Sequence, residues 1–121
     1  MSSISRRAAF SALAALLLPP AAAHAHAILE GSTPPSGGKM PAGAVTLTFR
    51  FNSRIDRGRS RLTLTGADHV RTILTIDPDG PPDILTAHVI LAPGAYVARW
   101  LVLAVDGHIT RGDVPFTVEG N

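Results

Sequence analysis

Apolar and polar residues alternate along much of this chain with the two-residue period of β-strands, and no helical period is visible. The clearest case is residues 45–51, where Val45, Leu47, Phe49 and Phe51 would share one face. Trp100 lies on the apolar side of another such segment, and we expect it in the core. With a short first strand around 27–30, the pattern predicts about seven strands, the others covering residues 61–65, 70–76, 84–91, 95–105 and 114–118.

Segments rich in proline and glycine separate these expected strands. They cover residues 33–38, 77–82 and 93–94, and residues of this kind end strands and form turns. Many short strands at this spacing are typical of two packed antiparallel sheets. The chain is 121 residues long, which allows one domain. We therefore predict an all-β fold, a Greek-key β-sandwich of the immunoglobulin-like or cupredoxin-like kind.

The first 25 residues have the pattern of a secretory signal peptide. Arg6 and Arg7 precede an apolar run over residues 8–18, and two prolines and a string of small residues follow. The run is too short to anchor the chain in a bilayer. We expect cleavage after Ala25, which leaves residues 26–121 as an exported, periplasmic domain that begins with His26. Cleavage after Ala23 or after Ala27 is also compatible with the sequence, and so are both the general and the twin-arginine export routes.

Charge and cysteine content exclude several classes of function. Outside the expected signal peptide, nine basic residues balance nine acidic ones, which argues against binding to nucleic acid. The chain has no cysteine, so it forms no disulfide, thiolate zinc site or thiol nucleophile. Nothing in the composition indicates an obligate dimer, and we expect a monomer.

An N-terminal histidine would be an unusual metal ligand, because its α-amine and its imidazole can chelate one ion together. Far along the chain, Asp106 and His108 offer a carboxylate and a second imidazole. On an extended strand, residues two apart face the same side, and Gly107 between them would allow close backbone approach. His26, Asp106 and His108 would thus supply three nitrogens and one oxygen, a set that suits tetragonal Cu(II).

The other histidines have different expected roles. His69 follows Asp68 in an expected turn, and His88 lies opposite the apolar face of its strand, so we expect both at the surface. His24 becomes relevant if cleavage follows Ala23. His24-Ala25-His26 would then offer a free amine and a histidine at the third position, a second way to hold Cu(II) without Asp106 or His108.

From His26 onward, the sequence resembles the CopC family of periplasmic copper-resistance proteins. The resemblance rests on an ordered set of motifs: residues 26–37 (HAILEGSTPPSG), 47–51 (LTFRF), 62–64 (LTL), 93–100 (PGAYVARW) and 105–108 (VDGH), followed by Gly112 and residues 116–118 (FTV). It implies a cupredoxin-like sandwich that binds one Cu(II) ion through His26, Asp106 and His108. It also implies partnership with an inner-membrane copper-transport protein of the CopD type.

The sequence departs from the family pattern at three places. Ile109 stands where a proline is common, and Asn52-Ser53-Arg54 stands where many members carry an acidic residue near the copper. Members with a second, Cu(I) site use clustered methionines, whereas Met40 is the only methionine after the expected signal peptide. Because thioether and thiolate are the ligands that Cu(I) prefers, we predict a single Cu(II) site and no methionine-rich Cu(I) site.

The sequence favours a binding protein without turnover, a periplasmic Cu(II) carrier or buffer. A copper-brace monooxygenase is one alternative, since such enzymes also use an N-terminal histidine. The anionic Asp106 would disfavour copper reduction, and the aromatic content of 5% leaves little for a sugar-binding face. A metal-free, immunoglobulin-like interaction module is the other alternative, although it gives no reason for these ligands to occur together.

Overall fold

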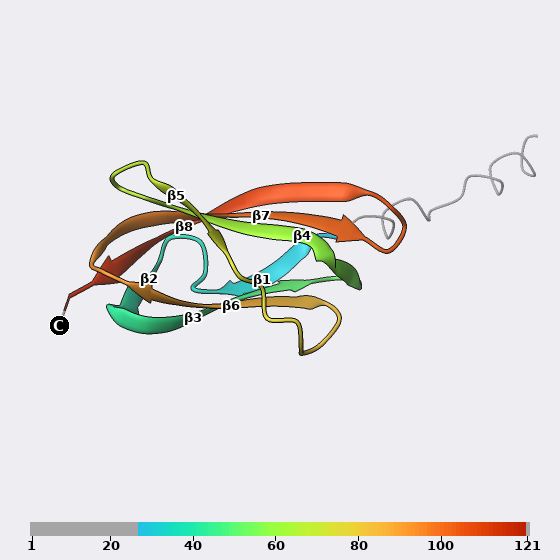
Figure 1. The fold of residues 1–121 in the computed structure, drawn as a ribbon, viewed down its shortest axis with the longest axis horizontal. Helices are drawn as coiled ribbons and strands as arrows, with labels where there is room; N and C mark the ends of the chain where they lie inside the picture. Colours follow the sequence, from blue (N-terminus) through green and yellow to red (C-terminus); the bar gives the residue numbers. More distant parts are fainter. Residues whose placement is uncertain (1–26, 121) are drawn as a thin grey trace, which may run out of the picture.

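The computed structural model describes residues 27–120, which fold into two packed β-sheets (Figure 1). One sheet has three strands in the order β1-β3-β6, and the other has five in the order β2-β8-β7-β4-β5. The strands are β1 (Leu29–Thr33), β2 (Gly38–Pro41), β3 (Gly43–Phe51), β4 (Ile55–Gly66), β5 (Arg71–Leu74), β6 (Ile84–Leu91), β7 (Gly94–Ala104) and β8 (Ile109–Glu119). The predicted all-β sandwich is therefore confirmed, with eight strands.

The alternating residues fill the space between the two sheets. In β3, Val45, Leu47, Phe49 and Phe51 are all buried, as their shared face predicts. Trp100 is also buried, and its ring meets that of Phe51 edge to face at 5.2 Å. The other buried side chains from the two sheets complete a single core: Ile55, Leu62, Leu64, Leu74, Leu85, Ala87, Leu91, Ala98, Val102, Ala104, Val114, Phe116 and Val118.

The strand that the sequence did not predict is β2. It begins at Gly38, the last residue of the segment 33–38 in which we expected a turn, and no apolar alternation marks it. It pairs in parallel with β8, from Gly38 opposite Phe116 to Pro41 opposite Glu119. The pairing depends on backbone hydrogen bonds to a strand far along the sequence, so a local pattern carries no signal of it.

Two other strands are longer than their apolar patterns. β4 begins at Ile55 and contains an irregularity between Asp56 and Arg61, where its pairing with β7 shifts register. β8 begins at Ile109, five residues before the expected start. The extra residues of β8 pair regularly with β7, from Leu103 opposite Ile109 onward. Two of their outward side chains, Arg111 and Asp113, are charged and contact water, and the third, Ile109, is apolar but exposed.

The pairing of β7 with β8 determines where the turn that contains Asp106 and His108 lies. The two strands form a long antiparallel hairpin whose ladder runs from Gly94 opposite Val118 to Leu103 opposite Ile109. The turn between them, residues 105–108, therefore lies at the end of the sandwich opposite the C-terminus (Figure 1). Among the described residues, no helix is long and apolar enough to span a bilayer.

Candidate metal centre

Asp106 and His108 lie in the tight turn that joins β7 to β8. The Gly107 amide donates to the carbonyl of Ala104 at 2.9 Å, and the Ala104 amide donates to the carbonyl of His108 at 2.9 Å. Gly107 has a φ of 91°, a conformation that side-chain-bearing residues rarely adopt. The expectation that Asp106 and His108 occupy an extended strand is therefore wrong. A glycine at positive φ reverses the chain between them instead.

The turn nevertheless brings the two side chains into direct contact. One Asp106 carboxylate oxygen accepts the His108 backbone amide at 3.1 Å, and the other lies 2.9 Å from Nδ1 of the imidazole. The Asp106 side chain is 31% exposed and the His108 side chain is 56% exposed. A carboxylate and an imidazole thus form a compact pair at the molecular surface. In metal sites, a carboxylate that contacts Nδ1 in this way also orients the imidazole that binds the metal.

The backbone that follows His26 is fixed close to this turn. Ala27 is fully buried, and its carbonyl accepts a hydrogen bond from the Thr110 hydroxyl at 2.7 Å. Thr110 stands two residues after His108, at the start of β8. His26 itself, like His24 and the expected signal peptide, lies outside the described residues. The first described residue of the chain is therefore held beside the Asp106–His108 pair.

Asn52 holds the next residue of this segment. Its side-chain oxygen accepts the Ile28 backbone amide at 2.8 Å, and its backbone amide donates to the Ile28 carbonyl at 3.0 Å. The sequence marked Asn52 only as a departure from the acidic residue expected there. Since either an amide or a carboxylate oxygen can accept the Ile28 N–H, Asn52 makes a contact that an acid could also make. Only the paired strands bring Ile28 and Asn52 together.

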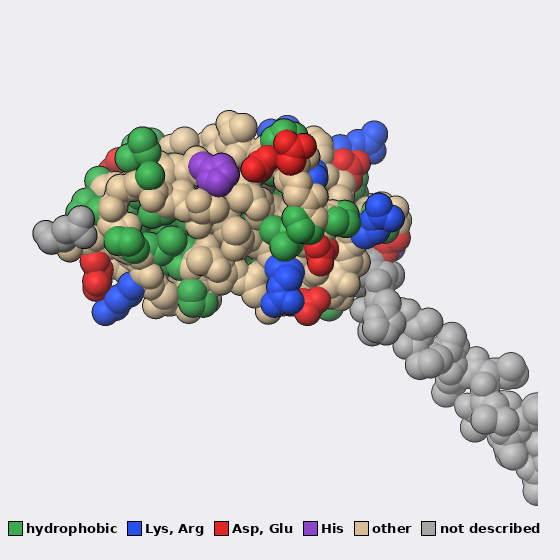
Figure 2. Space-filling model, turned by 90° about the horizontal axis from the view of Figure 1, so that it is seen from below, with side chains coloured by type: hydrophobic (Ala, Val, Ile, Leu, Met, Phe, Trp, Pro, Cys, Tyr) green, Lys and Arg blue, Asp and Glu red, His purple; other side chains and the backbone are tan. Residues whose placement is uncertain are grey.

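The remaining described histidines lie at the surface, as expected. His69 follows β4 in a turn with a φ of 62° and is exposed. His88 projects from β6, with Nδ1 3.0 Å from the Thr46 hydroxyl and Nε2 3.6 Å from an Asp77 carboxylate oxygen. Figure 2 looks onto the side of the three-stranded sheet and shows an exposed histidine there. Within residues 27–120, no three histidine or acidic side chains gather into a metal-binding group.

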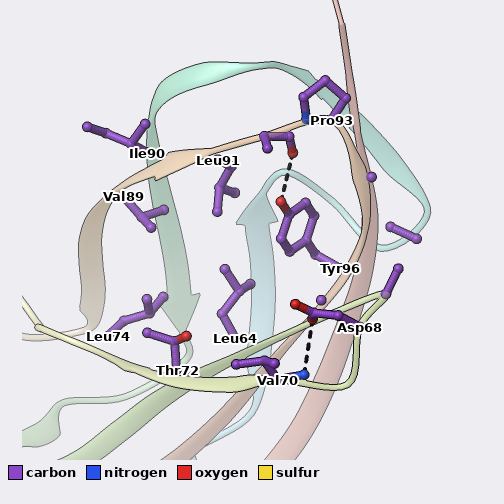
Figure 3. Close-up of a pocket in the computed structure, with 15 residues that line it drawn as sticks. Leu64, Asp68, Val70, Thr72, Leu74, Val89, Ile90, Leu91, Pro93 and Tyr96 are labelled. Atoms are coloured by element: carbon purple, nitrogen blue, oxygen red, sulfur yellow. Dashed lines mark hydrogen bonds between the residues drawn. The ribbon is translucent and has the colours of Figure 1, made fainter.

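A cleft of about 440 Å³ opens at the other end of the molecule, between β5 and β6 (Figure 3). Aliphatic side chains line most of it, among them Leu64, Leu74 and Leu91. Two of its polar side chains are bound within the cleft: the Tyr96 hydroxyl donates to the Ala92 carbonyl at 2.7 Å, and Asp68 accepts the Val70 amide at 3.1 Å. No histidine lines this cleft, so it is separate from the candidate metal centre.

Fold and site together define a class of protein: a small two-sheet β-sandwich with an acid–imidazole pair at the end where its first strand begins. Comparison with known proteins identifies the family. The CopC domain model matches residues 29–119. Protein YobA of Escherichia coli K12 is 30% identical over 108 residues, which cover 86% of each chain. The chain therefore belongs to the CopC domain family.

Solved structures show the same architecture. CopC from Methylosinus trichosporium OB3b superposes with a TM-score of 0.70 at 25% identity, over 79% of this chain and 96% of that one. PcoC from Escherichia coli, a methionine-rich copper resistance protein, superposes with a TM-score of 0.63 at 24% identity, over 78% of this chain and 99% of that one. The expected resemblance to CopC proteins, and the sandwich that it implied, are thus confirmed.

Proposed function

We propose that this protein is a periplasmic Cu(II) carrier or buffer that binds one ion per chain. The ligands are the α-amine and imidazole of His26, the carboxylate of Asp106 and the imidazole of His108. In this proposal the signal peptide is removed after Ala25, and the protein passes copper to an inner-membrane transport protein of the CopD type. It performs no catalytic turnover. Membership of the CopC domain family supports the choice of copper, since the related PcoC is a copper resistance protein.

One observation carries the proposed ligand set. The Thr110 hydroxyl holds the Ala27 carbonyl at 2.7 Å, two residues from His108 along β8. Residues about 80 positions apart in the sequence are thereby fixed at one end of the sandwich. Because His26 directly precedes Ala27, this contact supports a site in which an N-terminal chelate joins the Asp106–His108 pair. Three nitrogens and one carboxylate oxygen favour Cu(II) over the softer Cu(I).

The direct test is a Cu(II) titration of the exported protein, followed by electron paramagnetic resonance. Mass spectrometry first establishes that the purified chain begins at His26. We expect one axial signal with nitrogen hyperfine structure that saturates at one copper per chain, since the site has three nitrogen ligands. Several overlapping signals, or no tight binding, would contradict the proposal. Sustained peroxide turnover with ascorbate and oxygen would instead identify an oxidase or monooxygenase.

Asn52 provides a test of how the N-terminal segment is positioned. Replacing Asn52 by Leu removes the oxygen that accepts the Ile28 amide and leaves the size of the side chain nearly unchanged. We expect Cu(II) affinity to fall by about tenfold, as for other changes beyond the direct ligands. Asn52→Asp is the matched variant, because it retains an acceptor for Ile28. Equal affinities for the two variants, measured by chelator competition, would show that the Ile28 contact does not support the site.

A further inference from the structure

The outer face of the five-stranded sheet is unusually rich in arginine. Inward-pointing residues such as Leu62 and Val114 fill the core, so the odd-numbered residues of β4 after its irregularity, from Arg61 on, and those of β5, β7 and β8 point outward. Four of the nine basic residues in 27–120 lie among them, with a single acid, Asp113, on the same part of the face. These four are Arg61, Arg71, Arg99 and Arg111.

The strand register spreads these arginines across the sheet. Arg61 on β4 and Arg111 on β8 both stand opposite Leu101 on the intervening β7. They are therefore two strand spacings apart, roughly 10 Å. Arg71 lies on the edge strand β5, opposite Thr65. The basic face thus extends over four neighbouring strands.

Most other cations of the described chain are bound by neighbouring groups. Lys39, Arg50 and Arg59 form ion pairs with acidic side chains, and Arg57 donates to backbone carbonyls between Pro78 and Ile84. The side chains of Arg61, Arg71 and Arg111, by contrast, form no hydrogen bond or ion pair with any residue of 27–120, and all three are exposed. An arginine side chain without a partner among residues 27–120 is available to an anion from outside.

The fourth arginine, Arg99, is bound to Asp113. The Arg99 guanidinium donates two hydrogen bonds to the Asp113 carboxylate, at 2.8 and 3.1 Å. The hydrogen bond from Arg99 lowers the pKa of Asp113, so the acid stays ionised and the pair stays intact. The pair itself lines a shallow hollow of about 320 Å³, together with Thr63, Thr65, Arg71 and Val97. Hydroxyl and guanidinium groups there match the oxygens of a phosphate group.

The three-stranded sheet presents a different outer face. Along β3 the outward residues are Ala44, Thr46, Thr48 and Arg50, and Arg50 is paired with Glu30. Figure 2 shows this side, where acidic and basic side chains stand near one another, mostly toward one end of the face. The formally balanced charge of the domain is therefore divided unequally between its two faces. Because of this unequal charge distribution, a negatively charged surface would attract the molecule by its basic face.

We propose that the outer face of the five-stranded sheet binds the phosphate headgroups of an anionic phospholipid membrane. The wide spacing of Arg61, Arg71 and Arg111 favours a surface that presents many phosphates in one plane, since one free phosphate cannot reach all three. Exposed aliphatic side chains lie between the arginines, with Ile73 68% and Val97 36% exposed, and they suit the interfacial region of a bilayer. Arg111 follows His108 by three residues, so the metal-binding turn would lie near the membrane surface.

The experiment is co-sedimentation of the exported protein, with its signal peptide removed, with phosphatidylglycerol vesicles at low salt. Each arginine near an anionic surface contributes about a fivefold increase in partitioning. We therefore expect the triple variant Arg61→Gln, Arg71→Gln and Arg111→Gln to bind about 100-fold more weakly than the unmodified protein. Binding should also fall as salt rises, and phosphatidylcholine vesicles should bind neither protein.

Two further variants separate a specific face from general charge or misfolding. Arg50→Gln with Arg54→Gln removes two cations away from this face and should leave vesicle binding nearly unchanged. Asp113→Asn should release Arg99 and increase binding about fivefold, a gain that a damaged fold would not produce. Cu(II) titration of each variant reports separately on the metal site, because none of these residues belongs to it.

Several results would overturn the proposal. One is that the unmodified protein does not sediment with phosphatidylglycerol vesicles. Another is that the Arg50 and Arg54 variant binds the vesicles as weakly as the triple variant. Release of the protein from vesicles by millimolar inorganic phosphate, at constant ionic strength, would indicate a site for the free anion instead. Binding to polyglutamate that depends on the same three arginines, without vesicle binding, would indicate an acidic protein partner.

Discussion

Adding one methionine between Ala25 and His26 is expected to weaken Cu(II) binding by at least about 100-fold. The extension moves the free α-amine away from the His26 imidazole and turns the former amine into an amide, so the two-point chelate is lost. Changes beyond the direct ligands of a metal typically cost 10–100-fold in affinity, and loss of a direct ligand should reach or exceed the upper end. The measurement is competition with a chelator of known affinity, on protein whose first residue is established by mass spectrometry.

A methionine added after Asn121 is the matched control. The C-terminus lies at the end of the sandwich opposite the β7–β8 turn, so this extension should leave affinity unchanged (Figure 1). Equal affinity for the two extended proteins would mean that the amine is not a ligand. An exported protein that starts at His24 and binds Cu(II) tightly would indicate the amine–amide–imidazole site of His24-Ala25-His26 instead.

Replacing both Asp106 and His108 by alanine should have a comparable effect, a loss of at least about 100-fold in Cu(II) affinity. It removes one oxygen and one nitrogen from the proposed ligand set and leaves only the N-terminal chelate. The electron paramagnetic resonance signal should change at the same time, since the number of coupled nitrogens falls. Circular dichroism should show an intact sandwich, because the core does not include either side chain.

The chain contains a matched control for this double variant. Asp77 and His88 form another acid–imidazole contact, with 3.6 Å between the carboxylate oxygen and Nε2. His88 lies on β6 and Asp77 in the loop before it, away from Ala27 and Thr110. Replacing both by alanine changes the same residue types and should leave Cu(II) affinity intact. If the two double variants lose affinity equally, the turn between β7 and β8 is not the copper site.

Asp106→Asn separates two roles of the carboxylate. Asparagine retains an oxygen that can accept the His108 backbone amide, but it loses the negative charge. Loss of affinity close to that of the alanine variant would indicate that Asp106 binds copper directly. A small loss would indicate that it orients the imidazole through the contact at Nδ1.

The strands with strong alternation could be predicted because burial on one face leaves a local record. Residues 84–91 were predicted with the bounds that β6 has, and the apolar residues of 45–51 all entered the core. β2 and the first five residues of β8 could not be predicted in this way. β2 is held by backbone hydrogen bonds to the distant β8, and the first residues of β8 by those across the turn to β7, and such bonds form with almost any side chain.

The candidate site shows the same division. Asp106, Gly107 and His108 stood out as a triplet, and their side chains do meet, although in a turn rather than on a strand. Asn52 carried no signal of its role, because its partner Ile28 is 24 residues away. The arginine face is also invisible along the chain, since Arg61, Arg71 and Arg111 are separated by tens of residues.

The sequence by itself determined that this chain is a cysteine-free β-sandwich with the motifs of the CopC family, because alternation and motif order are properties of neighbouring residues. Only the tertiary structure decided which distant groups meet. Strand pairing placed Ala27 against Thr110, Ile28 against Asn52, and three arginines on one face. These contacts depend on the register of the strands and on the packing of the two sheets. Both are determined by the hydrophobic core as a whole, and no local segment determines them alone.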